Sequence, residues 1–503
     1  MGSEGAHIGD PLALVGFVCY LGVMVLIGIL TARFASGSLG DFFLGGRRMK
    51  DYVVALSAVV SGRSAWLILG VSGMAYVRGV SAVWAVVGYI VAELFLFLFV
   101  GKRLRRYTAR GGDITLPDFF ESRFKDTQHI LRVVSVVIIV VFMVTYVSAQ
   151  LTAGGKAFSS SFNLSPLEGL LLTAGIVLIY TILGGFLAVS LTDVLQAVLM
   201  LVGLAGLPLV TIARFGGVDA VISKLASTDA LMLDPWSVGI GGLIGFLGIG
   251  LGSPGNPHIL VRYMSVKSPA QLRRSALIGT VWNVLMAWGA VFVGLVGRAY
   301  YPAKDVLPSA DTENLYTFLA AHHFHPLLFG LTVAAIFAAI MSTADSQLLV
   351  ASSGVVRDIY QKLIRRGPDL SERKMVAVSR VTVLLLVILA VGLGVLAEGL
   401  IFWLVLFAWA GLGASFGPTM ILSLFWPRIT RWGVLAGFLS GTTVTVLWRL
   451  VPTLKATLYE LVPGFVVSTI LVVSVSLLTS PPPDARIEIE SISPVYTFKR
   501  KGT

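Results

Sequence analysis

The sequence predicts an all-helical membrane protein that crosses the bilayer many times. Hydrophobic residues make up 56% of the 503 residues, charged residues only 13%, and the mean hydropathy is +0.88. A soluble protein would carry about 25% charged residues. Apolar runs of roughly 20 residues recur along the chain, and each can cross about 30 Å of hydrocarbon as a helix. Runs of this length exclude a β-barrel, whose strands are about 10 residues of alternating pattern.

The apolar runs divide the chain into about 13 predicted spans. In order, they cover roughly residues 11–33, 52–77, 82–101, 133–155, 165–183, 187–213, 237–261, 275–298, 326–355, 378–397, 399–426, 431–448 and 458–479. Polar or basic connections separate them, which is the pattern of a polytopic helical bundle.

The basic residues are distributed unevenly among the connections, and this predicts the orientation. With the N-terminus outside, most of the 38 Lys and Arg residues fall in the inner loops and the tail. Cytoplasmic loops accumulate such residues. We therefore expect a multi-pass protein of the plasma (inner) membrane, with its N-terminus outside and its C-terminus in the cytoplasm. Arg63 is the only basic residue that this assignment leaves inside the bilayer.

Two apolar segments contain residues that interrupt a helix. The first, SAVVSGRSAW (57–66), has three serines and one glycine, and the second, GIGLGSPGNPHIL (248–260), has several glycines and two prolines. Pro254 and Pro257 each remove a donor and clash with the preceding turn. Interrupted helices at membrane depth line a protected cavity. When they occur at corresponding positions of two halves, they point to the binding site of a transporter.

The two interrupted segments do occupy corresponding positions, because each opens a run of five predicted spans. An odd number of spans places the two runs in opposite orientations, which predicts an inverted repeat. The expected divisions are 1–51 (N-terminal outside segment, extra helix and first inner loop), 52–213 (first repeat), 214–236 (outer linker), 237–426 (second, inverted repeat), 427–480 (two C-terminal helices) and 481–503 (cytoplasmic tail).

Arg63 poses an energetic problem for this arrangement. A guanidinium in hydrocarbon costs about 2.5 to 3.5 kcal/mol on insertion scales, and a buried one needs a counter-charge. Acidic residues inside the predicted spans are few, and we expect Asp345 to be the partner, with Asp193 second and Glu93 left over. The alternative is that Arg63 extends its side chain to a membrane surface.

Several long stretches carry a family resemblance. They include DYVVALSAVVSGRSAW (51–66), GNPHILVRYM (255–264) and AAIMSTADSQLLVASS (338–353). Over nearly the whole chain the residues resemble the solute:sodium symporter family, and within it the sodium/proline symporters. The resemblance implies a LeuT-type fold with a five-plus-five inverted repeat and discontinuous core helices 1 and 6. It also implies a secondary transporter and not an enzyme.

The resemblance implies a sodium site made of main-chain oxygens and two hydroxyl groups: Val60, Arg63, Ala339, Ser342 and Thr343. Two positions depart from the family pattern. Gly62 stands where the proline symporters have an aspartate, and Arg63 stands where they have an uncharged residue. A fixed cation about 4 Å from a sodium ion would repel it by about 4 kcal/mol at an effective dielectric constant of 20.

The predicted substrate site lies at the two mid-membrane breaks and one neighbouring helix. Its residues are Ser61, Gly62, Arg63, Ser64, Trp66, Tyr146, Ile249, Gly250, Ser253 and Asn256. By resemblance, Ile249 and Ser253 replace an aromatic pair of the proline symporters, whereas Tyr146 is kept. We expect a small amino-acid-like substrate and contact with the lipid bilayer, and neither nucleic acid nor an obligate protein partner.

Several functional hypotheses follow for Arg63. It could replace the sodium ion by reaching Ser342, Thr343 and Asp345, so that transport is sodium-independent or proton-coupled. It could instead bind a substrate carboxylate through a bidentate contact. A third hypothesis is conventional sodium symport with Arg63 turned away. No cofactor is expected apart from a sodium ion. If Arg63 replaces sodium, as in the first hypothesis, that ion is not bound either. A non-transporting membrane sensor is the alternative from another class.

Overall fold

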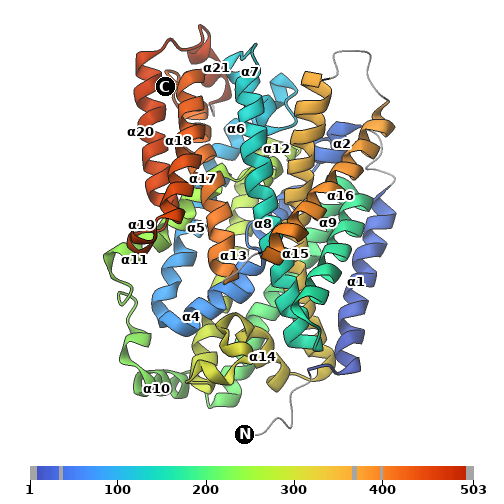
Figure 1. Cartoon of the computed structure of the whole chain (residues 1–503), viewed down its shortest axis with the longest axis vertical. Coiled ribbons are helices and arrows are strands. Elements are labelled where there is room, and N and C mark those ends of the chain that lie inside the picture. Colours follow the sequence, from blue (N-terminus) through green and yellow to red (C-terminus); the bar gives the residue numbers. More distant parts are fainter. Residues whose placement is uncertain (1–7, 33–37, 365–370, 397–399, 494–503) are drawn as a thin grey trace, which may run out of the picture.

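The computed structural model describes residues 8–32, 38–364, 371–396 and 400–493, and the regular structure of these residues is helical. Long helices run side by side along the long axis of the molecule (Figure 1). Ten helices of the described residues are long and apolar enough to cross a membrane, and three shorter apolar helices accompany them. The helical bundle is confirmed, whereas the number of spans stays a prediction.

The first half of the chain contains one leading helix and the helices predicted as the first repeat. These are α1 (Pro11–Ala32), α3 (Asp51–Ser61), η2 (Trp66–Val71), α4 (Ser72–Arg78), α5 (Val83–Phe95), η4 (Leu96–Val100), α6 (Gly101–Gly111), α8 (Ile130–Phe162) and α9 (Pro166–Phe215). The chain turns within α9 at Gly185, whose φ of 58° and ψ of −173° are not helical. This turn separates the two spans predicted at 165–183 and 187–213.

The second half contains the helices predicted as the second repeat and two more at the edge of the bundle. They are α11 (Gly239–Gly248), η6 (Ile249–Gly255), α12 (Pro257–Ser265), α13 (Leu272–Tyr300), α15 (Pro326–Ser353), η11 (Gly354–Ile364), α16 (Glu372–Leu396), α17 (Ile401–Phe425), α18 (Arg431–Leu450) and α20 (Leu461–Leu478). Short helices connect the long ones or follow the last of them: α2 (Leu39–Leu44), α7 (Leu116–Phe124), α10 (Val218–Thr228), α14 (Leu315–His323), α19 (Pro452–Thr457) and α21 (Ala485–Ile492).

Both predicted helix breaks are present. In the first half, α3 ends at Ser61, and Ser64 takes a left-handed backbone conformation with φ of 50° before η2 begins. In the second half, η6 winds as a 3-10 helix across Pro254, and Asn256 is extended before α12 starts at Pro257. Proline fits this first helical position because its missing N–H would have no intrahelical partner.

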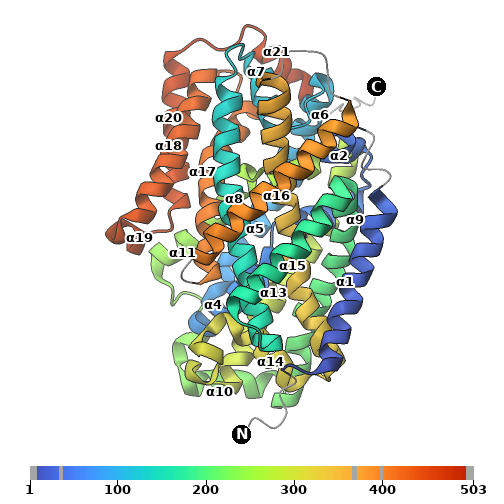
Figure 2. The ribbon, with the colours of Figure 1, turned by 45° about the vertical axis from the view of Figure 1, so that its right-hand side comes forward.

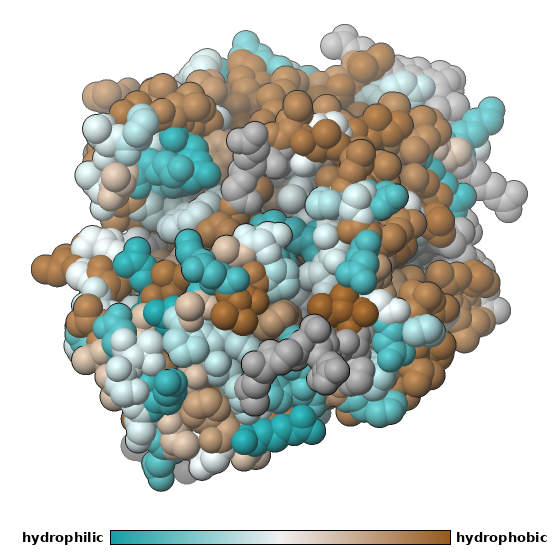
Figure 3. Space-filling model, turned by 60° about the horizontal axis from the view of Figure 1, so that its bottom comes forward, coloured by the Kyte–Doolittle hydropathy of each residue, from teal (hydrophilic) through white to brown (hydrophobic). Residues whose placement is uncertain are grey.

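The centre of the bundle is α15, which packs against α1, α8 and α9 (Figure 2). Its most apolar stretch is 83% buried inside the protein, compared with 28% for α20 at the edge. The residues of both breaks are buried as well, among them Ser61, Ser64, Pro254 and Asn256, so the breaks lie inside the bundle. At the end that carries α10 and α14, polar residues cover much of the surface, whereas apolar residues gather along the sides (Figure 3).

Candidate ion and substrate site

An oxygen-lined site lies where the end of α3 meets the middle of α15. Because α3 ends at Ser61, its last carbonyl groups lack a full set of intrahelical donors. The Ser342 hydroxyl lies 3.5 Å from the Val60 carbonyl oxygen and 3.2 Å from that of Ala339. The Thr343 hydroxyl donates to the Ser61 carbonyl at 3.1 Å. We call these five residues the oxygen site; four of them belong to the predicted sodium site.

The fifth residue of the predicted sodium site, Arg63, adds no oxygen to these groups, and only its main-chain N–H reaches them, donating to the Val60 carbonyl at 3.1 Å. Its carbonyl accepts a hydrogen bond from the Leu67 amide at 3.1 Å, which starts the next helical segment. Its guanidinium points to another group of helices, as described below. The oxygen site is therefore built without Arg63.

The prediction that Arg63 pairs with Asp345 or Asp193 was wrong. The guanidinium forms a salt bridge with Glu93 of α5, and its Nε donates to the Asn283 amide oxygen of α13 at 2.8 Å. It also lies over the Tyr89 ring, 3.6 Å from the ring centroid. Only 1% of the side chains of Arg63 and Glu93 is exposed, so the guanidinium does not extend to a membrane surface either. Sequence reasoning counted Glu93 among the intramembrane acids but ranked it below two aspartates.

Asp193 pairs instead with a second buried arginine, Arg262 of α12. The closest nitrogen and oxygen are 3.2 Å apart, and Arg262 also donates to the hydroxyls of Ser57 and Ser346. Asp345 lies next to this group and accepts a hydrogen bond from Ser346 at 3.0 Å. Arg63 is therefore not the only basic side chain enclosed by the helices of the described residues. The predicted span ended at residue 261, which left Arg262 in an inner loop, whereas α12 continues to Ser265.

Two carboxylate oxygens in this second group have no hydrogen-bond partner in the described residues. They are Oδ1 of Asp193 and Oδ2 of Asp345, and both side chains are fully buried. A buried carboxylate oxygen without a donor is costly. Since Ser342 and Thr343 lie on the same stretch of α15 as Asp345, spare negative charge lies beside the oxygen site.

The predicted substrate residues of the first break are partly brought together. Ser64 lies 3.5 Å from the Tyr146 hydroxyl of α8, and the Ala65 amide donates to the Gln150 side-chain oxygen at 3.1 Å. Trp66 turns the other way and packs against Tyr89 and Phe402. The side-chain nitrogens of Trp66 and Gln150 are buried without a partner among the described residues. These polar groups are available to a ligand.

The predicted residues of the second break mostly shape the backbone. The Trp409 indole donates to the Ile249 carbonyl at 2.8 Å, and the Asn256 amide donates to Gly252 at 2.8 Å. A side chain on Gly250 would strike the Gly88 carbonyl of α5 at 2.1 Å. Gly250 therefore permits close packing of η6 against α5 and is not free to contact a ligand through a side chain.

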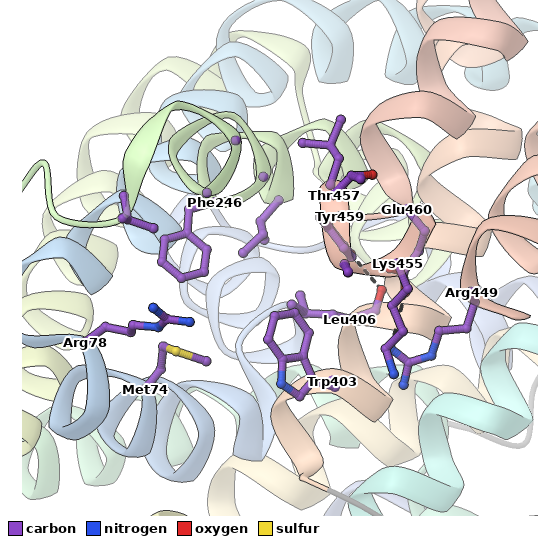
Figure 4. Close-up of a pocket in the computed structure, with 17 residues that line it drawn as sticks. Met74, Arg78, Phe246, Trp403, Leu406, Arg449, Lys455, Thr457, Tyr459 and Glu460 are labelled. Atoms are coloured by element: carbon purple, nitrogen blue, oxygen red, sulfur yellow. Dashed lines mark hydrogen bonds and ion pairs between the residues drawn. The ribbon is translucent and has the colours of Figure 1, made fainter. Parts of the chain in front are cut away.

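A cavity of about 350 Å³ leads from the surface to Ile249 (Figure 4). Apolar side chains of α4, α11 and α17 form one part of its wall, among them Phe246 and Trp403. Arg449 and Lys455 enter it from the opposite side, and Arg78 lies below Phe246. Of the predicted substrate residues, Ile249 lines this cavity. The cavity therefore offers a ligand a path from the surface to the second break.

Sequence reasoning missed Glu93, Asn283, Arg262 and Gln150. For two of them a signal was present. Glu93 follows Tyr89 by one helical turn, so both share the face of α5 that meets Arg63. Gln150 follows Tyr146 by the same interval on α8. Asn283 had no local signal, because an amide in an apolar helix is equally consistent with any polar contact.

Comparison with known proteins gives concordant results. The sodium:solute symporter family matches residues 42–441. The high-affinity proline transporter PutP of Bacillus subtilis is 40% identical over 92% of this chain and 97% of its own length. The osmoregulated proline transporter OpuE of the same organism is 36% identical over 97% and 99%, and a sodium/proline symporter of Staphylococcus aureus is 39% identical over 92% of both chains.

Solved structures agree on the fold. A Na+-coupled sialic acid symporter in an outward-open state superposes with a TM-score of 0.78 at 19% identity, covering 93% of this chain and 98% of that one. MhsT in complex with L-phenylalanine gives a TM-score of 0.52 at 15% identity, covering 85% and 97%. The LeuT-type fold expected from the sequence is confirmed, and the chain is a member of the sodium:solute symporter family, a transporter and not an enzyme.

Proposed function

We propose that this transporter couples the uptake of proline or a closely similar amino acid to one sodium ion bound at the oxygen site. The relatives, two proline transporters and a sodium/proline symporter, support the substrate class. The oxygen site and the two buried acids beside it, Asp193 and Asp345, support sodium as the coupled ion. We also expect the N-terminus to lie outside and the C-terminus in the cytoplasm, as the distribution of basic residues predicts.

The buried charges around the two breaks leave room for one monovalent cation. When all five side chains are ionised, Arg63 and Arg262 contribute two positive charges and Glu93, Asp193 and Asp345 three negative charges, and each of these side chains is at most 1% exposed. The group is thus one positive charge short of neutrality. Because an uncompensated buried charge is strongly unfavourable, a single bound cation would stabilise this arrangement.

The ligand chemistry favours sodium for that charge. Carbonyl and hydroxyl oxygens are the donors that hard cations prefer, and the oxygen site offers no sulfur or nitrogen ligand among its five residues. The residues present therefore fit a sodium ion held by Val60, Ala339, Ser342 and Thr343. Its chemistry would be purely electrostatic, since sodium carries charge and fixes the positions of its oxygen ligands.

The same geometry supplies a physical route to coupling. The oxygen site joins the broken end of α3 to α15, and the first break also carries Ser64, which faces Tyr146. An ion that holds α3 against α15 would hold Ser64 and the Ala65–Gln150 contact in place. Binding of the amino acid at the breaks would then be stronger when the ion is bound, and by linkage the reverse holds.

The turned-away guanidinium supports this proposal over sodium replacement by Arg63. The contacts of Arg63 are with Glu93, Asn283 and Tyr89, and not with Ser342, Thr343 or Asp345. The carboxylate of Glu93 therefore offsets the repulsion that the Arg63 guanidinium would exert on a sodium ion at the oxygen site.

Uptake of labelled proline into proteoliposomes tests the proposal when the sodium and pH gradients are varied separately. We expect uptake to require an inward sodium gradient and to persist without a pH gradient. Uptake that ignores sodium, or a transported substrate without an amino-acid backbone, would contradict the proposal. A panel of neutral amines, carboxylates and amino acids as competitors identifies the recognised group.

A second candidate is proton coupling, which one observation favours. The missing positive charge could be a proton on Asp345, whose Oδ2 has no partner in the described residues. In that case uptake follows the pH gradient, and Asp345→Asn abolishes this dependence while the sodium gradient has no effect.

A further inference from the structure

Position 62 is tightly enclosed by Ile259 of α12 and by the Glu93 carboxylate of α5. A Cβ atom added to Gly62 would lie 3.3 Å from Oε1 of Glu93 and 3.0 Å from Cδ1 of Ile259. Both distances are tighter than ordinary contacts, so the break in α3 and the Glu93 side chain of α5 fit together. The acidic group at the first break thus comes from α5 and not from α3 itself.

Glu93 and Asn283 hold the Arg63 side chain together, and they also contact each other. One carboxylate oxygen pairs with the guanidinium and the other accepts from the Asn283 amide nitrogen, while the Asn283 oxygen accepts from Arg63 Nε. The three side chains close a ring of contacts between the break after α3, α5 and α13. Tyr89 covers the guanidinium from its open face.

We infer that Glu93 is a positioning residue for ion coupling: it holds the Arg63 guanidinium away from the oxygen site and cancels its charge. This inference rests on the proposed function. Without Glu93, the guanidinium keeps its charge on a residue that follows Val60 and Ser61 directly in the break, and it gains the freedom to approach their carbonyl groups. The ring of contacts is therefore what allows an arginine to stand next to a cation site.

The charges predict effects of opposite sign for the two partners. Glu93→Gln adds one positive charge to the buried group, so the group is neutral before sodium binds and positive afterwards. Arg63→Met removes one positive charge from the buried group, so we expect sodium to bind more tightly. At roughly 8 Å and an effective dielectric constant of 20, a unit charge changes sodium affinity by about 30-fold, equivalent to about 2 kcal/mol.

The experiment measures the sodium concentration for half-maximal proline uptake in proteoliposomes, together with the melting temperature of each purified protein. We expect Glu93→Gln to raise the half-saturating sodium concentration by ten- to 30-fold, and the double variant Glu93→Gln/Arg63→Met to restore it. The variant Glu93→Gln/Asn283→Asp returns a carboxylate to Arg63 Nε from α13 and should also restore it. Glu168→Gln, an exposed acid at the start of α9, is the matched control and should change nothing.

The outcomes separate the inference from the proposed function. If wild-type uptake ignores sodium, the proposed function fails and takes this inference with it. If wild-type uptake requires sodium but both single variants change only the melting temperature or the maximal rate, Glu93 is a purely structural residue and the inference is overturned. A double variant Glu93→Gln/Arg63→Met that keeps the full sodium shift of Glu93→Gln would overturn it as well. Should a single variant not fold, the two double variants still decide, since both must bind sodium as the wild type does.

Discussion

Two buried arginines of the bundle, Arg63 and Arg262, are held in different ways. Arg63 meets one carboxylate, one amide and one aromatic face, and these groups enclose it completely. Arg262 meets Asp193, two serine hydroxyls and the His258 carbonyl, and two carboxylate oxygens beside it stay without a partner among the described residues. With all of their side chains ionised, the first group is neutral and closed, whereas the second is one positive charge short.

This difference separates a structural pair from a binding site. A closed pair of opposite charges gains nothing from a further ion, because every polar atom already has its contact. An open group with excess negative charge lowers the free energy of a nearby cation. The oxygen site lies against the open group, so an arginine close to an ion site need not prevent ion binding when its own charge is cancelled elsewhere.

The largest effect is expected from Arg262→Met. Its removal leaves Asp193 and Asp345 without a compensating cation, and breaking a buried pair costs about 3 to 5 kcal/mol. We expect a large fall in the melting temperature of the purified protein and loss of proline uptake. The double variant Arg262→Met/Asp193→Asn removes one of the two acids and should recover part of the stability. Equal melting temperatures for Arg262→Met and the wild type would show that the second group is not an ionic cluster.

Thr343→Val is expected to have the next largest effect. The valine keeps the shape of the side chain but removes the hydroxyl that lies 3.1 Å from the Ser61 carbonyl. Loss of one oxygen ligand to a charged partner costs about 1.5 to 3 kcal/mol, or roughly a tenfold or greater rise in the half-saturating sodium concentration. Thr332→Val on the same helix is the control, because the Thr332 hydroxyl donates only to Phe329 one turn away. A similar shift in both variants would place the effect outside the ion site.

A smaller, pH-dependent effect is expected at Asp113, outside the membrane-spanning helices. Burial raises the pKa of its carboxyl from 3.8 to about 7, although the hydrogen bond from Ser122 opposes the shift. Because the protonated form is favoured in the folded protein, this contribution to stability is complete below about pH 4 and is lost as the pH rises through 7. Between pH 5 and pH 8 the melting temperature should fall more for the wild type than for Asp113→Asn. Parallel curves for the two proteins would contradict the raised pKa.

The smallest effect is expected at the exposed pair of Lys125 and Asp484, which joins the region after α7 to the start of α21. The nitrogen and oxygen lie 2.8 Å apart, but about half of each side chain is exposed. Exposed pairs gain little because water already solvates both charges. Lys125→Ala should leave the melting temperature and uptake unchanged within error, which makes it the baseline for the buried pairs. A fall comparable to that of Arg262→Met would mean that burial does not decide the strength of these pairs.

Local chemistry made the architecture predictable. Long apolar runs can satisfy their backbone groups only as helices when they cross lipid, so the spans could be read from composition. The breaks at Ser61–Ser64 and at Pro254 follow from residues that act on their own backbone, and both are present. The grouping of Ser342 and Thr343 with the end of α3 was implied by the family resemblance, and the structure brings these residues together.

Pairing between distant side chains was harder to predict. Glu93, Asp193 and Asp345 are all acids within apolar runs, and from the chain alone each could neutralise Arg63. Asn283 lies 220 residues beyond Arg63, and nothing in its neighbours along the chain indicates the contact. The burial of Arg262 was missed for a related reason, since a basic residue at the edge of an apolar run is compatible with a loop or with a helix that continues.

The sequence by itself determined the membrane class, the places where the helices break and the chemical types of the residues at those breaks. Only the tertiary structure decided which carboxylate meets which guanidinium, and hence which charges cancel and which are left over. The reason is physical: a helix or a break depends on hydrogen bonds and sterics among residues a few positions apart. The energy of a charge depends on every group within several ångströms of it, whichever helix supplies them.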